Sequence, residues 1–115
     1  MEEENFFDRR IFERIPAKIS LKFMSQDSDK ENSALTNDVS AKGLSLIADE
    51  HLMPNTPLEM WLQIPDRDGR LYARGRVVWS ERLGPNQYRS GVDLERPELM
   101  GMSVILRNTY RNRIR

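Results

Sequence analysis

Strict alternation of apolar and polar residues is the feature that most limits how this chain can fold. It runs through residues 17–23 (AKISLKF) and again through residues 58–64 (LEMWLQI). Side chains along a β-strand point alternately to opposite faces, so this period is typical of a strand with one buried face. The residues predicted to face the core are Ala17, Ile19, Leu21, Phe23, Leu58, Met60, Leu62 and Ile64.

Turn-forming residues separate these strands from further strand-like segments. Residues 34–49 place two short apolar segments on either side of an Asn/Asp/Ser/Gly cluster, which predicts a strand, a turn and a second strand. An Asp-Gly pair at 68–69 is a hairpin signal, and RLGPN (82–86) separates the strand-like segments 71–81 and 87–94. About six short strands joined by turns predict a mainly β fold, a small antiparallel six-stranded β-barrel.

The two ends of the chain have patterns that differ from the barrel segment. Residues 1–15 combine acidic residues, aromatics and clustered arginines without a long apolar run, which predicts a flexible N-terminal arm. Residues 96–115 change to helical spacing after a proline suited to a first turn, which predicts a C-terminal α-helix and a basic tail. Residues 16–95 form the predicted barrel, so the 115 residues are predicted to make one domain.

Composition argues against most catalytic and metal-binding chemistry. Lys+Arg and Asp+Glu both total 18, so no overall field favours DNA or an anionic membrane surface. Cysteine is absent, and the single histidine, His51, sits beside a proline-containing loop without obvious metal-ligand partners. We therefore predict neither a metal site nor an enzyme. The N-terminus lacks a signal-peptide pattern and no apolar run approaches a membrane helix, so a cytoplasmic location is expected.

A cluster of arginines lies just before the first predicted strand. Arg9, Arg10 and Arg14 all fall within FFDRRIFERIP (6–16). A solvated arm explains such a cluster without any function. The functional alternative is an anion site, because a guanidinium fork fits the oxygens of an anion such as phosphate bidentately.

A second polar motif lies between two predicted strands. In NDVSAKG (37–43), Asp38, Ser40 and Gly43 have the spacing Asp-x-Ser-x-x-Gly. A plain turn explains this pattern, since Asp and Ser bond nearby backbone groups and glycine tolerates positive φ.

Taken together, the two stretches resemble the PilZ domain, a bacterial receptor for the second messenger cyclic di-GMP. Residues 10–14 match the family motif Arg-x-x-x-Arg, with an additional arginine before it, and residues 38–43 match Asp-x-Ser-x-x-Gly. ARGRVVWSE and SGVDL look like later strands of the family barrel, so the similarity extends over nearly the whole chain. The resemblance implies that cyclic di-GMP binds to Arg9, Arg10, Arg14, Asp38, Ser40 and Gly43.

The resemblance also implies a mechanism. A doubly anionic ligand that bridges the arm and the barrel would order the arm and change the surface offered to an unidentified effector protein. Besides cyclic di-GMP no cofactor, DNA or membrane is expected, and the chain would be a monomer or weak dimer. Two alternatives stay open: a PilZ-like interaction module that binds no nucleotide, and a small barrel that binds single-stranded RNA. RNA-binding surfaces usually expose several aromatics, whereas Trp61 and Trp79 are predicted in the core or barrel wall.

Overall fold

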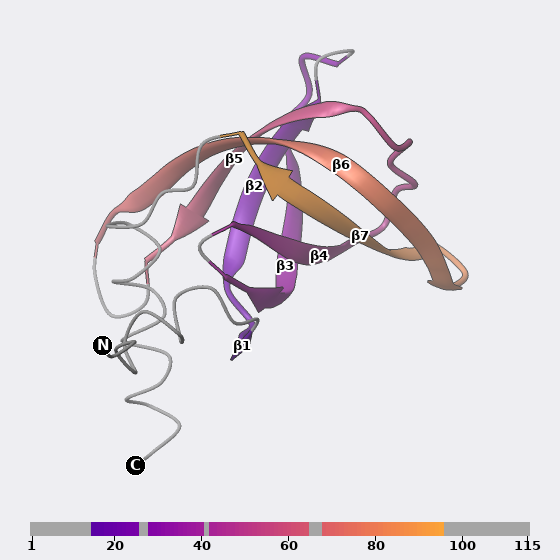
Figure 1. The fold of residues 1–115 in the computed structure, drawn as a ribbon, viewed down its shortest axis with the longest axis horizontal. Helices are drawn as coiled ribbons and strands as arrows, with labels where there is room; N and C mark the ends of the chain where they lie inside the picture. Colours follow the sequence, from indigo (N-terminus) through magenta and orange to yellow (C-terminus); the bar gives the residue numbers. More distant parts are fainter. Residues whose placement is uncertain (1–14, 26–27, 41, 65–67, 96–115) are drawn as a thin grey trace, which may run out of the picture.

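The structure, a computed structural model, describes residues 15–25, 28–40, 42–64 and 68–95. Seven antiparallel strands run through these residues (Figure 1). Their order is β1-β3-β2-β5-β6-β7-β4, and a further pairing of β3 with β4 closes the sheet into a barrel. The strands are β1 (Ile15–Pro16), β2 (Ser20–Ser25), β3 (Asn32–Val39), β4 (Gly43–Ala48), β5 (Pro57–Gln63), β6 (Arg70–Gly84) and β7 (Gln87–Leu94).

Strands β1 and β2 pair with the same neighbour, β3, and together occupy one position of a six-stranded barrel. Buried Thr36 on β3 bridges the break between them. Its Oγ1 donates a hydrogen bond to the Ala17 carbonyl oxygen at 2.5 Å and accepts one from the Ile19 N–H group at 2.8 Å. Buried backbone groups without partners cost free energy, so this threonine lets the strand break while its polar groups stay satisfied. The strand predicted over 17–23 therefore begins its regular ladder only at Ser20.

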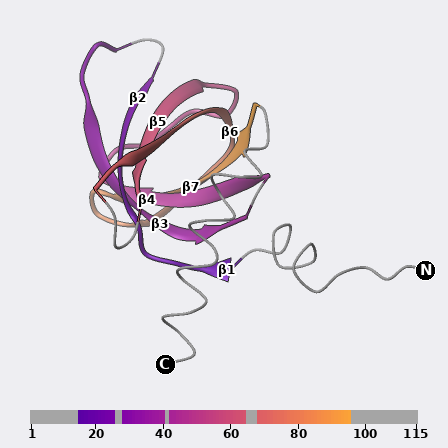
Figure 2. The ribbon, with the colours of Figure 1, turned by 90° about the vertical axis from the view of Figure 1, so that its left-hand side faces the viewer.

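The alternating apolar residues fill the interior of the barrel. Seven of the eight residues predicted from the alternation are buried, and the eighth, Ile64, is half-buried against the same core. Figure 2 shows the strands wrapped around this common interior. The remaining buried apolar residues are Val39, Leu44, Leu46, Ala48, Leu52, Ala73, Val77, Val92 and Leu94. Burial of apolar surface at about 25 cal/mol per Å² is the main stabilising contribution of such a core.

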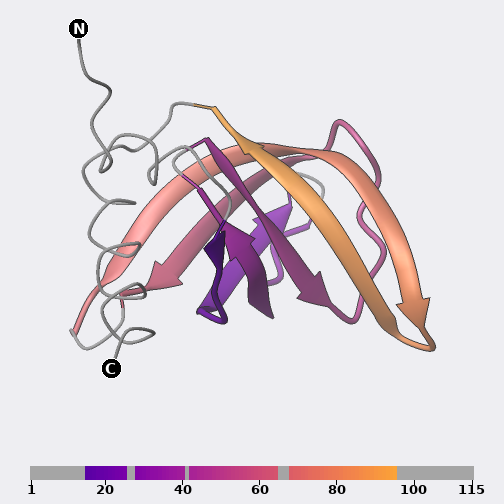
Figure 3. The same cartoon turned by 60° about the horizontal axis from the view of Figure 1, so that its bottom comes forward.

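The longest strand, β6, curves over the barrel with β7 beside it (Figure 3). Only Pro85 and Asn86 separate these strands, because the ladder continues to Gly84, which lies opposite Gln87. Asn86 takes a φ of 56°, a left-handed conformation that asparagine adopts more readily than most residues. The turn predicted over residues 82–86 is therefore correctly located but shorter than expected.

The mainly β fold and the six-stranded antiparallel barrel are confirmed. The predicted switch arm falls mostly on residues 1–14, and the predicted helix and tail on 96–115; both lie outside the described residues. Ile15, the last residue of the predicted arm, instead pairs with Val39 as part of β1. In the part of the chain that the structure describes, no helix has the length and apolar character needed to cross a membrane.

Candidate functional site

Four residues on neighbouring strands form a row on the outer face of the barrel, which we call the Asp38 row. Asp38 on β3 lies opposite Ser45 on β4, Ser45 lies opposite Gly91 on β7, and Gly91 lies opposite Trp79 on β6. Directly opposed residues in antiparallel strands share a face of the sheet. The four positions therefore form one continuous strip across four strands, although they are far apart in the sequence.

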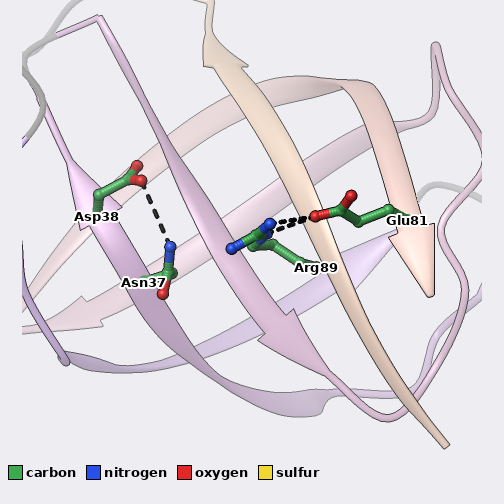
Figure 4. Close-up of polar contacts among 4 residues, drawn as sticks. All are labelled: Asn37, Asp38, Glu81 and Arg89. Carbon is green, nitrogen blue, oxygen red and sulfur yellow. Dashed lines mark hydrogen bonds and ion pairs between the residues drawn. The ribbon is translucent and has the colours of Figure 1, made fainter. Parts of the chain in front are cut away.

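The position of Asp38 depends on an irregularity in β3. The pairing between β3 and β4 shifts register between Thr36 and Asp38, so the intervening Asn37 is an extra residue. A β-bulge of this kind redirects neighbouring side chains. Asp38 is half-buried, and the Asn37 side-chain amide donates to its Oδ2 at 3.5 Å (Figure 4). Because of the bulge, Thr36 is buried on the inner side of β3 while Asp38 lies in the outer row.

Ser40 builds the turn that joins β3 to β4. Its side chain is buried, with 3 % of the residue exposed. The hydroxyl donates to the Gly43 carbonyl oxygen and accepts from the N–H groups of Lys42 and Gly43, each at 3.2 Å. A serine hydroxyl offers one donor and two acceptor lone pairs, so these contacts use its whole capacity. Ser40 therefore stabilises the conformation of the turn.

Gly43 packs closely against the backbone of β7. It lies opposite Asp93, and a Cβ atom added at this position would overlap the backbone carbonyl oxygen of Val92. The adjacent Lys42 carbonyl also accepts from the Leu94 N–H group at 2.8 Å. The motif glycine is therefore required for the two strands to meet beside the turn.

Gly43→Ala is expected to destabilise the barrel by about 1–3 kcal/mol, because the backbone of β7 must shift to admit a methyl group. Gly84→Ala is the matched control, since a Cβ atom there would meet open space. Urea unfolding followed by far-ultraviolet circular dichroism measures both. Equal midpoints for the two variants would show that the strands do not require a glycine at position 43.

At the other end of the row, Trp79 lies over Gly91. A Cβ atom at Gly91 would collide with the Trp79 indole, so the ring rests directly on the glycine backbone. The tryptophan is nevertheless 40 % exposed. Between the two ends, the Ser45 hydroxyl is buried and has no hydrogen-bond partner among the described residues. The row thus combines a carboxylate, a hydroxyl and an aromatic ring.

A positively charged residue, Arg89, lies two residues from Gly91 along β7. Arg89 lies opposite Glu81 on one side and Ile47 on the other. Its Nε donates to the Glu81 Oε2 atom at 2.8 Å, and its Nη2 atom contacts the same oxygen (Figure 4). Two residues along a strand span about 7 Å, so this partly exposed guanidinium borders the Asp38 row.

Comparison with known proteins gives the family. The family model described as PilZ domain matches residues 8–110, which is most of the chain. The chain belongs to the PilZ domain family. Among curated proteins, none matches the sequence.

Two solved structures show the same PilZ fold at low sequence identity. The Bacillus subtilis inhibitor of motility MotI/DgrA has a TM-score of 0.69 and 13 % identity, over 88 % of this chain and 49 % of that one. The PilZ domain of CeSA from a cellulose-synthesizing bacterium has a TM-score of 0.59 and 19 % identity, over 88 % of this chain and 98 % of that one. The present chain thus spans about half the length of MotI/DgrA. PilZ domains are generally cyclic di-GMP receptors, and they are binding modules rather than enzymes.

The predicted PilZ site residues divide into those the structure describes and those it does not. Asp38, Ser40 and Gly43 all lie at one end of the β3–β4 hairpin. The predicted ligand residues Arg9, Arg10 and Arg14 lie outside the described residues. Among the described residues no group of His, Asp and Glu side chains is arranged to hold a metal ion. His51 contacts the Tyr88 ring at a centroid distance of 5.4 Å.

Sequence reasoning did not include Trp79, Ser45 or Arg89 in the site. Trp79 was predicted to pack in the core or the barrel wall, and the structure places it on the outside of the wall. In the sequence, the relevant feature is Gly91, because a glycine in a strand often leaves room for a close neighbour, here Trp79. Recognising that signal requires the register of β6 and β7, which the alternating pattern alone does not give.

Proposed function

We propose that this PilZ domain is a cyclic di-GMP receptor whose binding surface includes the Asp38 row. The observation that carries the proposal is the alignment of Asp38 and Trp79 on one outer face, beside the turn made by Ser40 and Gly43. All four residues of the row lie on paired strands, so their backbones are held in fixed relative positions. Preorganised groups of this kind lower the entropic cost of binding.

The two ends of the row suit a guanine base in different ways, and three strand spacings of about 4.8 Å each separate them. The Asp38 carboxylate accepts the N1–H and N2–H₂ donors of guanine, and such charge-assisted hydrogen bonds are stronger than neutral ones. The exposed Trp79 ring offers a flat apolar surface for stacking, which is worth roughly 1–3 kcal/mol per base. Arg89 adds a partly exposed guanidinium beside them. A ligand with two guanines and two phosphates matches this combination.

The arginine motif joins the barrel next to Asp38. Arg14 is linked directly to Ile15, and Ile15–Pro16 pairs with β3 opposite Val39 and Asp38. Five residues of extended chain span at most about 18 Å, so Arg10 remains within reach of the same surface. This connection supports a site in which Arg9, Arg10 and Arg14 supply the phosphate and base-edge contacts. Ligand binding would then order the arm against the barrel.

The proposed output is a contact with an effector protein. An arm held by cyclic di-GMP would present a different surface from the empty arm, and an effector would distinguish the two states. MotI/DgrA, an inhibitor of motility, shares the fold, which supports an adaptor role. We place the receptor in the cytoplasm, as a monomer or weak dimer.

Titration calorimetry of the chain with cyclic di-GMP tests the receptor proposal. Saturable binding is expected, and GTP and cyclic di-AMP should bind at least tenfold more weakly because they lack the paired guanines. Trp79→Ala is expected to weaken binding about tenfold, as lost stacking predicts. Absence of heat at millimolar cyclic di-GMP, with folding confirmed by circular dichroism, would refute the receptor and favour the nucleotide-independent module.

A further inference from the structure

An open groove crosses the outer wall of the barrel on the side of β4 and β3 next to the Asp38 row, and we call it the Trp61 groove. Its volume is about 610 Å³. It crosses β5, β2, β3, β4 and the start of β7, which are consecutive around the barrel, and Arg70 at the start of β6 borders it beside β5. No residue of the Asp38 row lines it. The groove therefore offers a second surface for binding.

One end of the groove combines an aromatic ring with two cations. Trp61 lies beside Lys22, and Arg70 lies two positions along the neighbouring strand from Tyr72, the residue opposite Trp61. Within the described part of the chain, neither Lys22 nor Arg70 pairs with a carboxylate; the Lys22 Nζ atom donates to the Ser33 hydroxyl at 2.9 Å. This end therefore has positive charge available to a ligand.

The Trp61 side chain at this end packs against Tyr72 on the neighbouring strand. The Trp61 and Tyr72 rings pack at a tilt, with centroids 5.6 Å apart. The Tyr72 hydroxyl donates to Glu59 at 2.7 Å, and this hydrogen bond is the main cause that raises the pKa of the Tyr72 phenol above its usual value. A ring held in this way loses little further freedom on binding.

The rest of the groove is apolar in the middle and polar, with one carboxylate, at the far end. Leu35 is 46 % exposed and lies opposite half-buried Ile47, which places two aliphatic side chains in the middle. Beyond them lie the amides of Asn86 and Gln87 and the carboxylate of Asp49. The two ends of the groove therefore carry opposite charges, which favours one orientation of a bound segment.

We propose that the Trp61 groove docks an extended segment of a partner protein, with acidic residues at the Lys22 end and aliphatic residues over Leu35 and Ile47. Five strands spaced about 4.8 Å apart span about 19 Å, which accommodates roughly six extended residues. Tryptophan, tyrosine and arginine are the residue types enriched in the centres of protein interfaces. A nucleic acid fits less well, because its regularly spaced phosphates would meet the Asp49 carboxylate at the far end.

Peptide selection tests the groove without cyclic di-GMP and so independently of the receptor proposal. A phage-displayed library of random peptides of about eight residues is selected on the immobilised chain. Enriched peptides are expected to carry Asp or Glu in one half and Leu, Ile or Val in the other. The double variant Lys22→Glu/Arg70→Glu should enrich basic peptides instead. Lys30→Glu, which changes an exposed cation outside the groove lining, should leave the acidic preference unchanged.

A synthetic peptide with the enriched sequence then locates the contact. Trp61→Ala and Leu35→Asp should each weaken it about fivefold or more; Leu35 is exposed, so its variant keeps a test available if Trp61→Ala fails to fold. The groove proposal is overturned by a selection without charge preference, or by one that charge reversal leaves unchanged. It is also overturned if an oligouridine of about 12 nucleotides binds the groove and displaces the peptide, since that result assigns the surface to nucleic acid.

Discussion

Arg14→Ala is expected to weaken cyclic di-GMP binding by roughly tenfold to a hundredfold, and Arg10→Ala by a similar factor. Hydrogen bonds to charged groups contribute about 1.5–3 kcal/mol each, and every 1.4 kcal/mol is a factor of ten in affinity. Both substitutions lie before the first residue of β1, and circular dichroism of each variant checks that the barrel still folds. Titration calorimetry at fixed ionic strength measures the change, because contacts to phosphate weaken as salt screens them.

Arg14→Lys separates charge from geometry at the same position. Lysine keeps the positive charge but lacks the planar fork that bonds two acceptors at once. An affinity between those of the original chain and of Arg14→Ala is therefore expected. Arg82→Ala, on the β6–β7 hairpin beyond the Asp38 row, is the matched control and should bind normally. Unchanged affinity in both Arg10→Ala and Arg14→Ala would contradict the proposed arm contact.

The barrel was predictable because its signals are local. Alternation in residues 17–23 and 58–64 depends only on neighbours in the sequence, and the structure buries or half-buries every residue that it assigns to the core. Prolines, glycines and asparagines likewise mark the turns between strands. The interruption at residues 17–19 was not predictable, because it depends on the hydroxyl of Thr36 on the next strand.

The candidate surface was only partly predictable, because strand register is not local. Asp38 was identified from its motif, yet its alignment with Trp79 depends on three strand pairings and two register shifts. A shift of one residue in any pairing would send a side chain to the opposite face. Arg89 has no motif of its own, and its place beside the row follows only from the register that puts Gly91, two residues away on β7, in the row.

The structure also separates two roles that the sequence motif left together. Asp38 and Ser40 each fitted both a turn and a ligand site. Ser40 is buried and its hydroxyl is fully used by the turn, whereas Asp38 is half-buried on the outer face. Different effects of substitution are therefore expected at the two positions.

Asp38→Ala is expected to lower cyclic di-GMP affinity about tenfold to a hundredfold while costing no more than about 1 kcal/mol of folding free energy. Asp38→Asn should lose nearly as much affinity, because its amide group replaces an acceptor with a donor that faces the guanine N–H groups. Ser40→Ala should instead lower the free energy of unfolding by about 1–3 kcal/mol, since it leaves turn groups unpaired. Calorimetric titration and urea unfolding of the same three variants distinguish the two effects. If Asp38→Ala unfolds while its affinity per folded molecule is unchanged, the aspartate serves the turn, and the base contact must lie elsewhere on the barrel.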